Sequence, residues 1–597
     1  MPTYKAPVED VTFLLNDVFQ IDRYNNLPGF SDATADVRAA ILDEAAKFSE
    51  KVLQPLNHSG DLEGCTRHDD GRVTTPAGFK DAFKQLADGG WLGLSGPAEY
   101  GGQGLPVTLS QTVNEFLISA NMAFSMYGGL TMGAMAALLV HGSDEQKNTF
   151  VPNMMAGKWA GTMNLTEPQC GTDLGLMRTK AVKQADGTYK ITGTKIFISG
   201  GEQDLTENIV HLVLARIEGA PAGIKGVSLF VVPKVKLNAD GSVSNEPNGV
   251  SCGSIEHKMG IHGNSTCVLN FDNAVGTLVG EENKGMAAMF VMMNEARLGV
   301  GVQGLAQSEV AYQNAAAYAK DRLQGRALTG AKEASASADP IIVHPDVRRM
   351  LMSTRAFNEA ARALVVWTSL KSDLAHRSDD PKERQAADDH MGLLTPVVKG
   401  MLTDVGFANT VAAQQVYGGH GYIQETGVEQ FVRDARIAMI YEGANGIQAL
   451  DLVGRKLGRD GGRAITAFFN EVSAFAKENG GNEALKPFIG PLTNSLQHLQ
   501  QATMWLMQNA MAKPDNAGAA STDYLHLFGL VTLAYMWAKM AKVAQDKLAE
   551  SGEQPYLKSK LVTGKFFMER MLPETALRLA RIQTGAGSMM ELPAEAF

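Results

Sequence analysis

The sequence predicts an α+β chain of several domains, with a β-rich section between two helical sections. Length is the first observation, because 597 residues exceed what a single hydrophobic core supports. The second is the hydrophobic period, which is helical over 36–159, changes to short β-branched runs over 160–285, and is helical again from 286 onward. The third is composition, since 45% hydrophobic and 20% charged residues are typical of a globular chain.

The N-terminal part is expected to be an arm followed by a helical domain. Residues 1–35 carry Pro, Asn and Asp at short intervals, which predicts an irregular arm. Helical spacing then predicts an N-terminal α-helical domain over 36–159. The glycine pair at 89–90 and the segment 97–104 are expected to interrupt its helices.

The middle domain, residues 160–285, is expected to be an antiparallel β domain with Asp-Gly and Asn-Gly turns. Its clearest expected strands are 191–198, 209–215 and 226–232. Residues 286–458 are expected to form a helical domain, and 459–597 a further small helical bundle. The glycine-rich segment 458–462 is the predicted boundary between these two helical domains.

Charge, cysteines and hydropathy limit the location and the partners. A formal net charge of −10 argues against nucleic-acid binding as the main function. The four cysteines lack zinc or redox spacing, and the N-terminus lacks a secretory signal, so a reducing, cytoplasmic location and no metal site are expected. The most apolar long segment, 524–540, contains His526 and Lys539 and is shorter than the ~20 residues of a spanning helix. We expect a buried bundle helix there and no membrane span.

The most informative segment is Ile-Tyr-Glu-Gly-Ala-Asn-Gly-Ile-Gln at 440–448. It places Glu442 in a glycine-broken turn after a helix that ends near 432–437. Asn445 is expected to cap the next helix, whose predicted apolar stripe is Ile447, Leu450 and Val453. A carboxylate on such a turn, taken alone, is most often a solvated loop residue or a partner of the helix dipole.

Three further segments change that interpretation. They are Met-Asn-Leu-Thr-Glu-Pro-Gln-Cys-Gly-Thr-Asp-Leu-Gly at 163–175, Ile-Thr-Gly-Thr-Lys-Ile-Phe-Ile-Ser-Gly-Gly at 191–201 and Gln-Val-Tyr-Gly-Gly-His-Gly-Tyr at 415–422. Each alone is ordinary turn chemistry. In this order, together with the Glu442 turn, they resemble the acyl-CoA dehydrogenase family of flavoproteins over roughly residues 40–455.

The resemblance implies a middle β barrel, a C-terminal four-helix bundle and, for 459–597, the extra helical domain of the family's long branch. The reaction makes a 2,3-double bond in an acyl thioester, which requires a base, a polarised carbonyl and a hydride acceptor. Side chains do not accept hydride reversibly, and the chain lacks a convincing Gly-x-Gly-x-x-Gly nicotinamide motif. The cofactor implied by the resemblance is FAD.

Glu442 matches the family's catalytic base, and its backbone N–H matches a donor to the thioester oxygen. Thr166 matches a flavin-ring contact, while Thr172 lies where the family has a hydroxyl near substrate and flavin phosphates. Phe197 and Ser199 replace the usual Trp and Thr, and both retain the ability to contact a flavin. As an alternative, both are ordinary strand residues that pack on one face of the sheet.

Other matches concern the far end of FAD and the substrate. Arg322 matches an arginine that binds the FAD pyrophosphate across a dimer interface, assisted by Gln324. Arg297 matches a substrate-site arginine, and a helix-surface ion pair explains it equally well. The expected FAD contacts are Met163, Leu165, Thr166, Gly171, Thr172, Phe197, Ser199, Arg322, Gln324, Gln415, Gly418, Gly419 and Ala444. The expected substrate contacts are Thr172, Arg297, Tyr441, Glu442 and Gly443.

One departure from the family pattern is Ala444, which replaces a common threonine, so a side-chain hydrogen bond to FAD is missing there. Segments 4–13, 321–326 and 344–350 are most similar to a branch that oxidises 3-(methylthio)propanoyl-CoA in dimethylsulfoniopropionate degradation. Alternatives are a medium- or long-chain fatty acyl-CoA dehydrogenase and an acyl-CoA oxidase. Glu442 argues against a flavin monooxygenase, and the negative charge argues against a DNA-associated relative. A homodimer is expected, with electron-transfer flavoprotein as the electron acceptor.

Overall fold

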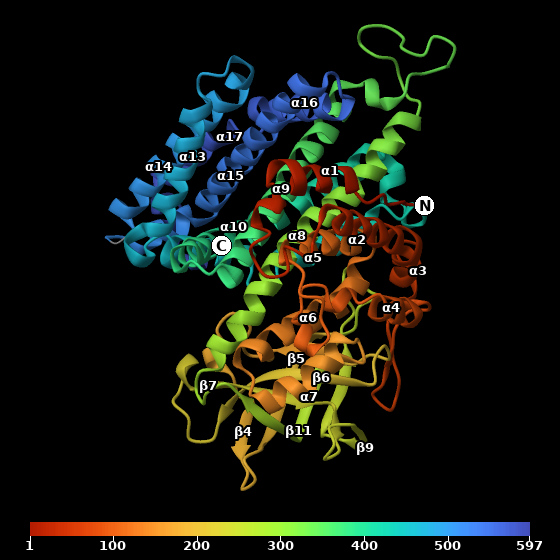
Figure 1. Ribbon diagram of the computed structural model, residues 1–597, viewed down its shortest axis with the longest axis vertical. Helices are drawn as coiled ribbons and strands as arrows, with labels where there is room; N and C mark the ends of the chain where they lie inside the picture. The colour runs from red at the N-terminus through yellow and green to blue at the C-terminus, as the bar shows by residue number, and fades with distance from the viewer. Residues whose placement is uncertain (511) are drawn as a thin grey trace. The chain divides into compact units, whose positions relative to one another are not determined.

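The computed structural model describes residues 1–510 and 512–597 (Figure 1). The chain divides into two compact units. The helical unit contains Met1–Ala46, Val107–Ser119 and Val300–Phe597, and the barrel unit contains Lys47–Pro106 and Ala120–Gly299. Along the chain, helices precede the main sheet and helices follow it, so the predicted α+β fold class is confirmed.

The barrel unit contains a seven-stranded sheet. Its strands are β3 (Trp159–Asn164), β4 (Lys180–Lys183), β5 (Tyr189–Ser199), β6 (Asn208–Ile217), β7 (Val227–Pro233), β10 (Val250–Ile255) and β11 (Thr266–Val279). β11 pairs with β5 and also with β7, while β4 and β6 complete the path between β5 and β7. This path closes into a ring, which makes the sheet a barrel, while β3 and β10 each pair with one strand of the ring. Buried Val213, Phe230 and Phe271 belong to one of its apolar clusters.

The expected antiparallel pairing holds for most strand pairs of this sheet and fails for two. β3 and β4 both pair parallel with β6, with Trp159 opposite Asn208 and Lys180 opposite Arg216. Turn residues indicate hairpins between neighbouring strands, but they do not show how distant strands pair. Two short hairpins were also not predicted. They are β1 (Thr66–Arg67) with β2 (Val73–Thr74), and β8 (Val235–Leu237) with β9 (Val243–Pro247).

The helices of the barrel unit precede most of its strands. They are α3 (Pro55–Glu63), α4 (Phe79–Asp88), α6 (Met122–His141) and α7 (Asp144–Met155). The helix stop at 89–90 is confirmed, because α4 ends at Asp88 and Gly90 has a left-handed φ of 70°. Segment 97–104 contains only a 3-10 turn, Ala98–Tyr100, as expected. α6 lies so close to β3 that a Cβ on Gly161 would be 2.5 Å from the Ala134 Cβ.

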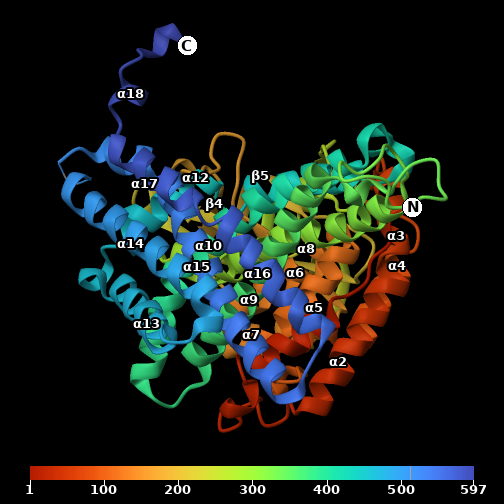
Figure 2. The same ribbon diagram turned by 90° about the horizontal axis from the view of Figure 1, so that it is seen from above.

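The helical unit contains most of the helices. Its helices are α1 (Val8–Thr12), α2 (Ala35–Phe48), α5 (Val107–Ala120), α8 (Gly285–Asp321), α9 (Pro345–Arg377), α10 (Pro381–Val416), α11 (Glu429–Arg436), α12 (Asn445–Asp451), α13 (Arg463–Asn479), α14 (Lys486–Asn509), α15 (Pro514–Ser551), α16 (Pro555–Arg570), α17 (Glu574–Thr584) and α18 (Gly587–Met590). Some residues at one end of α2, α5 and α8 are assigned to the barrel unit. α9 packs against α10, and α15 lies among α14, α16 and α17 (Figure 2).

α15 confirms the expected buried helix at 524–540. Its side chains from Tyr524 to Met540 are almost all buried, including Trp537. α6 and α15 are both long and apolar enough to cross a membrane, but 61% and 83% of their most apolar windows are buried inside the protein. Such burial is typical of core helices in a globular fold.

The expectation of an irregular N-terminal arm is wrong. The arm contains α1, the π-helical turn Phe13–Val18 and the 3-10 turn Ile21–Tyr24. Burial of its apolar residues explains this order, because Leu14 and Leu15 are at most 1% exposed. Asp10 is also buried, and it pairs with Arg362 of α9 at 2.5 Å and with Lys560 of α16. The arm is therefore a structural part of the helical unit.

Candidate active site

The Glu442 turn, residues 440–444, lies between the 3-10 turn Ile437–Met439 and α12. Glu442 has a φ of 58°, and Gly443 follows with a φ of 87°. The left-handed region is open to glycine but unfavourable for glutamate, at a cost of about 1–3 kcal/mol. Such a conformation persists only where neighbouring groups hold it, so the partners of this turn are informative.

The side chain of Tyr441, which precedes Glu442, is held by a partly buried hydrogen bond. Tyr441 Oη donates to Gln303 Oε1 of α8. Burial raises the pKa of Tyr441 well above its ordinary value, and the negative charge of Glu442 raises it further. The tyrosine is therefore a neutral hydrogen-bond donor beside the carboxylate.

Two buried side chains bind the carbonyl groups of the turn. Lys399 of α10 is 0% exposed, and its Nζ donates to Gly443 O at 2.9 Å and to Asn445 Oδ1 at 2.7 Å. Gln448 Nε2 lies 3.2 Å from Glu442 O and 3.3 Å from Gly443 O. These bonds stabilise the strained backbone around Glu442.

The predicted cap of α12 is wrong. Ala444 occupies the N-cap position, and Asn445 is the first helical residue. The Asn445 side chain points to α10, where Nδ2 donates to Gly400 O, Thr403 Oγ1 and Asp404 Oδ1. Asparagine fits a capping pattern by sequence, but the acceptors on α10 compete for its amide.

The predicted apolar stripe of α12 is also wrong in part. Leu450 is 43% exposed, and the buried residues of α12 are Gln448, Ala449 and Asp451. Ile440, at the start of the turn, is 51% exposed. Ile447 and Val453 are half-buried, so the predicted stripe is buried only in part, and polar Gln448 and Asp451 are more buried than it is.

The barrel unit contains the segments expected to contact the flavin. Met163 lies near the end of β3, and Leu165 and Thr166 follow it. Thr166 O accepts from Ile196 N of β5 at 2.9 Å. Lys195 of β5, which is 0% exposed, donates to Leu165 O at 2.9 Å. The loop after β3 is thereby joined to the strand that carries Phe197 and Ser199.

A buried ion pair strengthens this connection. Lys195 Nζ lies 2.8 Å from Glu167 Oε1, and Glu167 also accepts from the backbone N–H groups of Arg178 and Thr179. Burial acts to raise the pKa of Glu167, but the Lys195 ammonium and these hydrogen bonds hold it at about 2. Glu167 is therefore ionised in the folded chain at neutral pH.

Phe197 does not pack on the sheet like an ordinary strand residue. Its φ is 60° and its side chain is 59% exposed. Ser199 is half-buried, while Gly171 and Thr172 are exposed. The Phe197 ring is therefore accessible to a ligand, and its flavin contact stays a prediction.

The remaining FAD-contact candidates, apart from Ala444 in the Glu442 turn, lie at the ends of two helices of the helical unit. Tyr318 near the end of α8 stacks on Tyr417 after α10, with ring centroids 4.1 Å apart. Arg322 and Gln324 follow Tyr318, and both are exposed. Gln415, Gly418 and Gly419 surround Tyr417, and these three are exposed as well. Gly418 has a φ of 58°, so a larger residue would be strained there.

Comparison with known proteins matches four family models to this chain. Models of the N-terminal, middle and C-terminal domains of acyl-CoA dehydrogenases match residues 36–158, 162–274 and 283–457. A fourth model, acetyl-CoA dehydrogenase C-terminal like, matches residues 468–593. The 3-methylmercaptopropionyl-CoA dehydrogenase of Ruegeria pomeroyi is 43% identical over 590 residues, which are 98% of this chain and 99% of that protein.

The chain belongs to the acyl-CoA dehydrogenase family. It is an FAD-dependent oxidoreductase. The broad-specificity linear acyl-CoA dehydrogenase FadE5 of Mycobacterium tuberculosis is 35% identical over the full length of both chains. Among solved structures, Caenorhabditis elegans ACDH-11 in complex with C11-CoA has a TM-score of 0.77 at 18% identity, and it covers 96% of this chain and 92% of its own. An acyl-CoA dehydrogenase of Bacillus anthracis complexed with FAD has a TM-score of 0.75 at 22% identity, with coverages of 95% and 90%.

The residues of this acyl-CoA dehydrogenase fit a flavin dinucleotide. The exposed Phe197 ring offers an apolar surface for a flat ring system. The exposed Arg322 guanidinium suits a pyrophosphate. A Cβ on Gly419 would meet no other described atom within 4 Å, which leaves room for a ligand beside the backbone. The loop after Arg322 is ordered by Asp339, which accepts from Ala327 N and Lys332 N.

The role of Arg297 stays a prediction. Its Nη1 lies 3.5 Å from Asn294 Oδ1, and its guanidinium carbon lies 5.9 Å from the Phe290 ring centroid. Both partners are neighbours on α8, so these two contacts are local to the helix. The described residues contain no group of three or more His, Cys, Asp or Glu side chains that could hold a metal ion.

The sequence reasoning missed the two buried lysines of the site. Lys399 lies in the apolar run Thr-Pro-Val-Val-Lys-Gly-Met-Leu, and Lys195 shares the inward-facing parity of Tyr189 and Ile191 on β5. A lone lysine at a core position of a helix or strand is rare unless it is paired. That contrast between residue type and position was the available signal.

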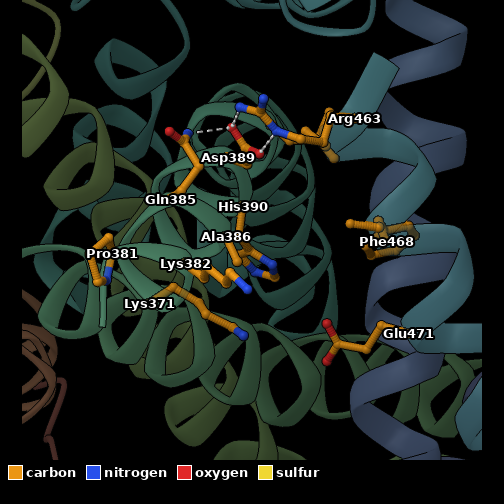
Figure 3. A pocket seen from close by; sticks show the side chains of 13 residues that line it. Lys371, Pro381, Lys382, Gln385, Ala386, Asp389, His390, Arg463, Phe468 and Glu471 are labelled. Atoms are coloured by element: carbon orange, nitrogen blue, oxygen red, sulfur yellow. Dashed lines mark hydrogen bonds and ion pairs between the residues drawn. The ribbon is translucent and has the colours of Figure 1, made fainter. Parts of the chain in front are cut away.

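A separate cavity of about 410 Å³ lies in the helical unit (Figure 3). It is lined by residues of α9, α10 and α13, among them Lys371, His390, Phe468 and Glu471. Arg463 and Asp389 at its edge pair with each other at 2.5 Å. Among the described residues that line this cavity, none is a predicted site residue, so it does not belong to the catalytic site.

Proposed function

We propose that this chain oxidises 3-(methylthio)propanoyl-CoA to 3-(methylthio)acryloyl-CoA in dimethylsulfoniopropionate degradation. The observation that carries this substrate is the 43% identity, over nearly the whole chain, to the Ruegeria pomeroyi protein of that name. The thioether replaces one methylene of a pentanoyl chain, so the acyl group is short and apolar, and an apolar site suits its polarizable sulfur.

Glu442 is the proposed catalytic base. It removes one proton from the α carbon of the thioester, and a hydride leaves the β carbon. Two C–H bonds are broken, and the single bond between the α and β carbons becomes a double bond. FAD, when bound, supplies the acceptor for that hydride. The backbone N–H of Glu442 donates to the thioester oxygen, where negative charge develops as the proton leaves.

The structure supports this role through the fixed conformation of the turn. Glu442 has a left-handed backbone conformation. Buried side chains donate hydrogen bonds to its carbonyl and to the carbonyl of Gly443. A fixed base reaches the α carbon without first being ordered, which lowers the entropic part of the barrier. Tyr441, Gly443, Thr172 and Arg297 are the further proposed substrate contacts.

The proposed FAD contacts come from both units. The barrel unit contributes Met163, Leu165, Thr166, Gly171, Thr172, Phe197 and Ser199. The helical unit contributes Arg322, Gln324, Gln415, Gly418, Gly419 and the backbone of Ala444. In the proposed homodimer, Arg322 and the Gln415 loop serve the FAD of the partner subunit.

The wider setting is also proposed. The chain is cytoplasmic, and electron-transfer flavoprotein accepts its electrons. Its sequence divides into an arm (1–35), an N-terminal helical domain (36–159), a middle β domain (160–285), a helical bundle (286–458) and an extra helical domain (459–597).

A second candidate substrate is a longer linear acyl-CoA, and the observation that favours it is the 35% identity to the broad-specificity linear acyl-CoA dehydrogenase FadE5. Specificity constants with 3-(methylthio)propanoyl-CoA, pentanoyl-CoA and palmitoyl-CoA decide between the two. We expect strong activity with the methylthio thioester, appreciable activity with pentanoyl-CoA, since one methylene changes binding by only ~1–3 kcal/mol, and little with palmitoyl-CoA. A preference for palmitoyl-CoA overturns the substrate and leaves the reaction type intact. Reoxidation of the reduced flavin in air, if fast, instead indicates an oxidase.

A further inference from the structure

The Glu442 turn is connected to the C-terminal part of the chain by a series of partly buried hydrogen bonds. The series begins at Gly443 O, which accepts from Lys399 Nζ. Lys399 Nζ also donates to the side-chain oxygen of Asn445 in α12. Asn445 Nδ2 lies 2.6 Å from Asp404 Oδ1 on α10. The other carboxylate oxygen, Asp404 Oδ2, lies 2.8 Å from His526 Nε2 on α15.

The chemistry of these groups fixes the direction of each bond. An ammonium only donates, so Asn445 presents its oxygen to Lys399 and its nitrogen to Asp404. A carboxylate only accepts, so His526 Nε2 carries the hydrogen in that bond. The donor and the acceptor of every hydrogen bond in the series are therefore fixed.

The two ends of the series are buried, while Asp404 and Asn445 between them are half-buried. Lys399 is 0% exposed and His526 is 8% exposed, so water replaces their partners only with difficulty. α15 belongs to the segment 468–593 that matches the extra C-terminal domain of the long branch. α12 and α10 also contact α15 directly.

We propose that His526, Asp404, Asn445 and Lys399 form a positioning relay, through which the extra C-terminal domain holds the base Glu442 in its reactive conformation. This inference rests on the proposed role of Glu442 and assigns a catalytic purpose to the extra domain. Its residues act on the turn and not on the substrate, so they are positioning residues. The consequence is that a change on α15 alters proton removal from the thioester.

The test compares two histidines of the extra domain by the same substitution. His526→Leu removes the donor to Asp404. His498→Leu is the matched control, because His498 on α14 is bonded to Thr575 Oγ1 at 3.0 Å and has no part in the relay. His526→Gln restores an N–H donor near the position of Nε2.

The measurements are FAD content, KM, kcat with 3-(methylthio)propanoyl-CoA, and exchange of the α protons in D2O with the flavin already reduced. For His526→Leu we expect kcat and the exchange rate to fall about tenfold, with KM and FAD content near the wild-type values, since a displaced base costs rate and not binding. His526→Gln recovers most of this loss, and His498→Leu stays within about twofold of wild type. Equal exchange rates in His526→Leu and His498→Leu would overturn the relay.

Asp404→Asn tests the same relay without a change of volume. An amide has one accepting oxygen, so it cannot accept from both Asn445 and His526 as the carboxylate does. We expect the exchange rate to fall as in His526→Leu, and this variant replaces His526→Leu if that protein does not fold. A Glu442→Gln enzyme that retains full exchange defeats the proposed base itself. A Glu442→Gln enzyme without exchange, beside an unaffected Asp404→Asn enzyme, defeats the relay alone.

Discussion

The Glu442 turn in the helical unit and the Thr166–Phe197 region in the barrel unit use the same device. Each contains a non-glycine residue with a left-handed backbone, Glu442 at φ 58° and Phe197 at φ 60°. Each is joined to its surroundings by a fully buried lysine that donates to a backbone carbonyl, Lys399 to Gly443 O and Lys195 to Leu165 O.

The two lysines differ in what else they bind. Lys195 is paired with the carboxylate of Glu167, which is itself buried and hydrogen-bonded by two backbone N–H groups. Lys399 binds the amide oxygen of Asn445, and the carboxylate of Asp404 lies one hydrogen bond further on. The barrel lysine therefore fixes a local ion pair, whereas the bundle lysine belongs to a series that reaches α15. This difference predicts that the first serves cofactor binding and stability, and the second serves proton transfer.

The largest expected effect is on turnover through Glu442. Glu442→Gln removes the base and leaves the residues of the barrel unit unchanged. We expect kcat to fall by about 10²–10⁴, the usual loss when a general base is removed, while the enzyme stays yellow and binds acyl-CoA. Stopped-flow reduction of the flavin measures this, and near-wild-type reduction would show that another group removes the proton.

The second prediction concerns stability through Lys195. Lys195→Met leaves the Glu167 carboxylate buried without its cation, so we expect a loss of about 3–5 kcal/mol in the free energy of unfolding, with loss of FAD. In the double variant Lys195→Met with Glu167→Gln, the charge is removed and the single amide oxygen accepts from one of the two backbone N–H groups, so part of the loss is recovered. Urea unfolding of the wild type, the two single variants and the double variant gives the coupling free energy between the two side chains. A double variant no more stable than Lys195→Met contradicts the ion-pair interpretation.

These two regions also show what the sequence predicts and what it does not. Periodicity predicted β5, β6 and the buried α15, because strands and helices bury every second or every third to fourth residue. Motifs predicted Glu442 and the Thr166 loop. The parallel pairing of β3 with β6 was not predicted, since pairing between distant strands is decided by the packing of the whole barrel. The amide of Asn445 was assigned to a cap, because its acceptors on α10 are 41 to 45 residues away in the sequence.

The third prediction concerns the far end of the cofactor. Arg322→Ala removes an exposed guanidinium without disturbing a buried pair, so the fold should remain intact. Hydrogen bonds to charged groups contribute about 1.5–3 kcal/mol, so we expect FAD to dissociate about ten- to a hundredfold more readily. If Arg322 serves the partner's FAD, the dimer weakens in parallel. Flavin content after gel filtration and the elution volume report both, and unchanged values for both would contradict the assignment.

The smallest expected effect is the acid dependence of the barrel ion pair. The pKa of Glu167 is held at about 2, below its ordinary value of 4.5, so its ionised form is stabilised by folding. The stabilisation is complete above pH 4.5 and is lost as the pH falls toward 2. The gap in Tm between wild type and Glu167→Gln should therefore be constant from about pH 7 to 5 and narrow below that range.

Glu202 of the same unit provides a control of opposite sign. It pairs with Lys234 at 2.5 Å, but burial raises its pKa despite that cation. Its protonated form is favoured by folding, so wild type gains stability relative to Glu202→Gln as the pH falls through the raised pKa. Two carboxylate–lysine pairs in one unit thus respond oppositely to acid, because burial outweighs the favourable partners of Glu202, whereas Lys195 and the hydrogen bonds to Glu167 outweigh burial there. If both Tm gaps change in the same direction with pH, this balance is wrong for one of the two pairs.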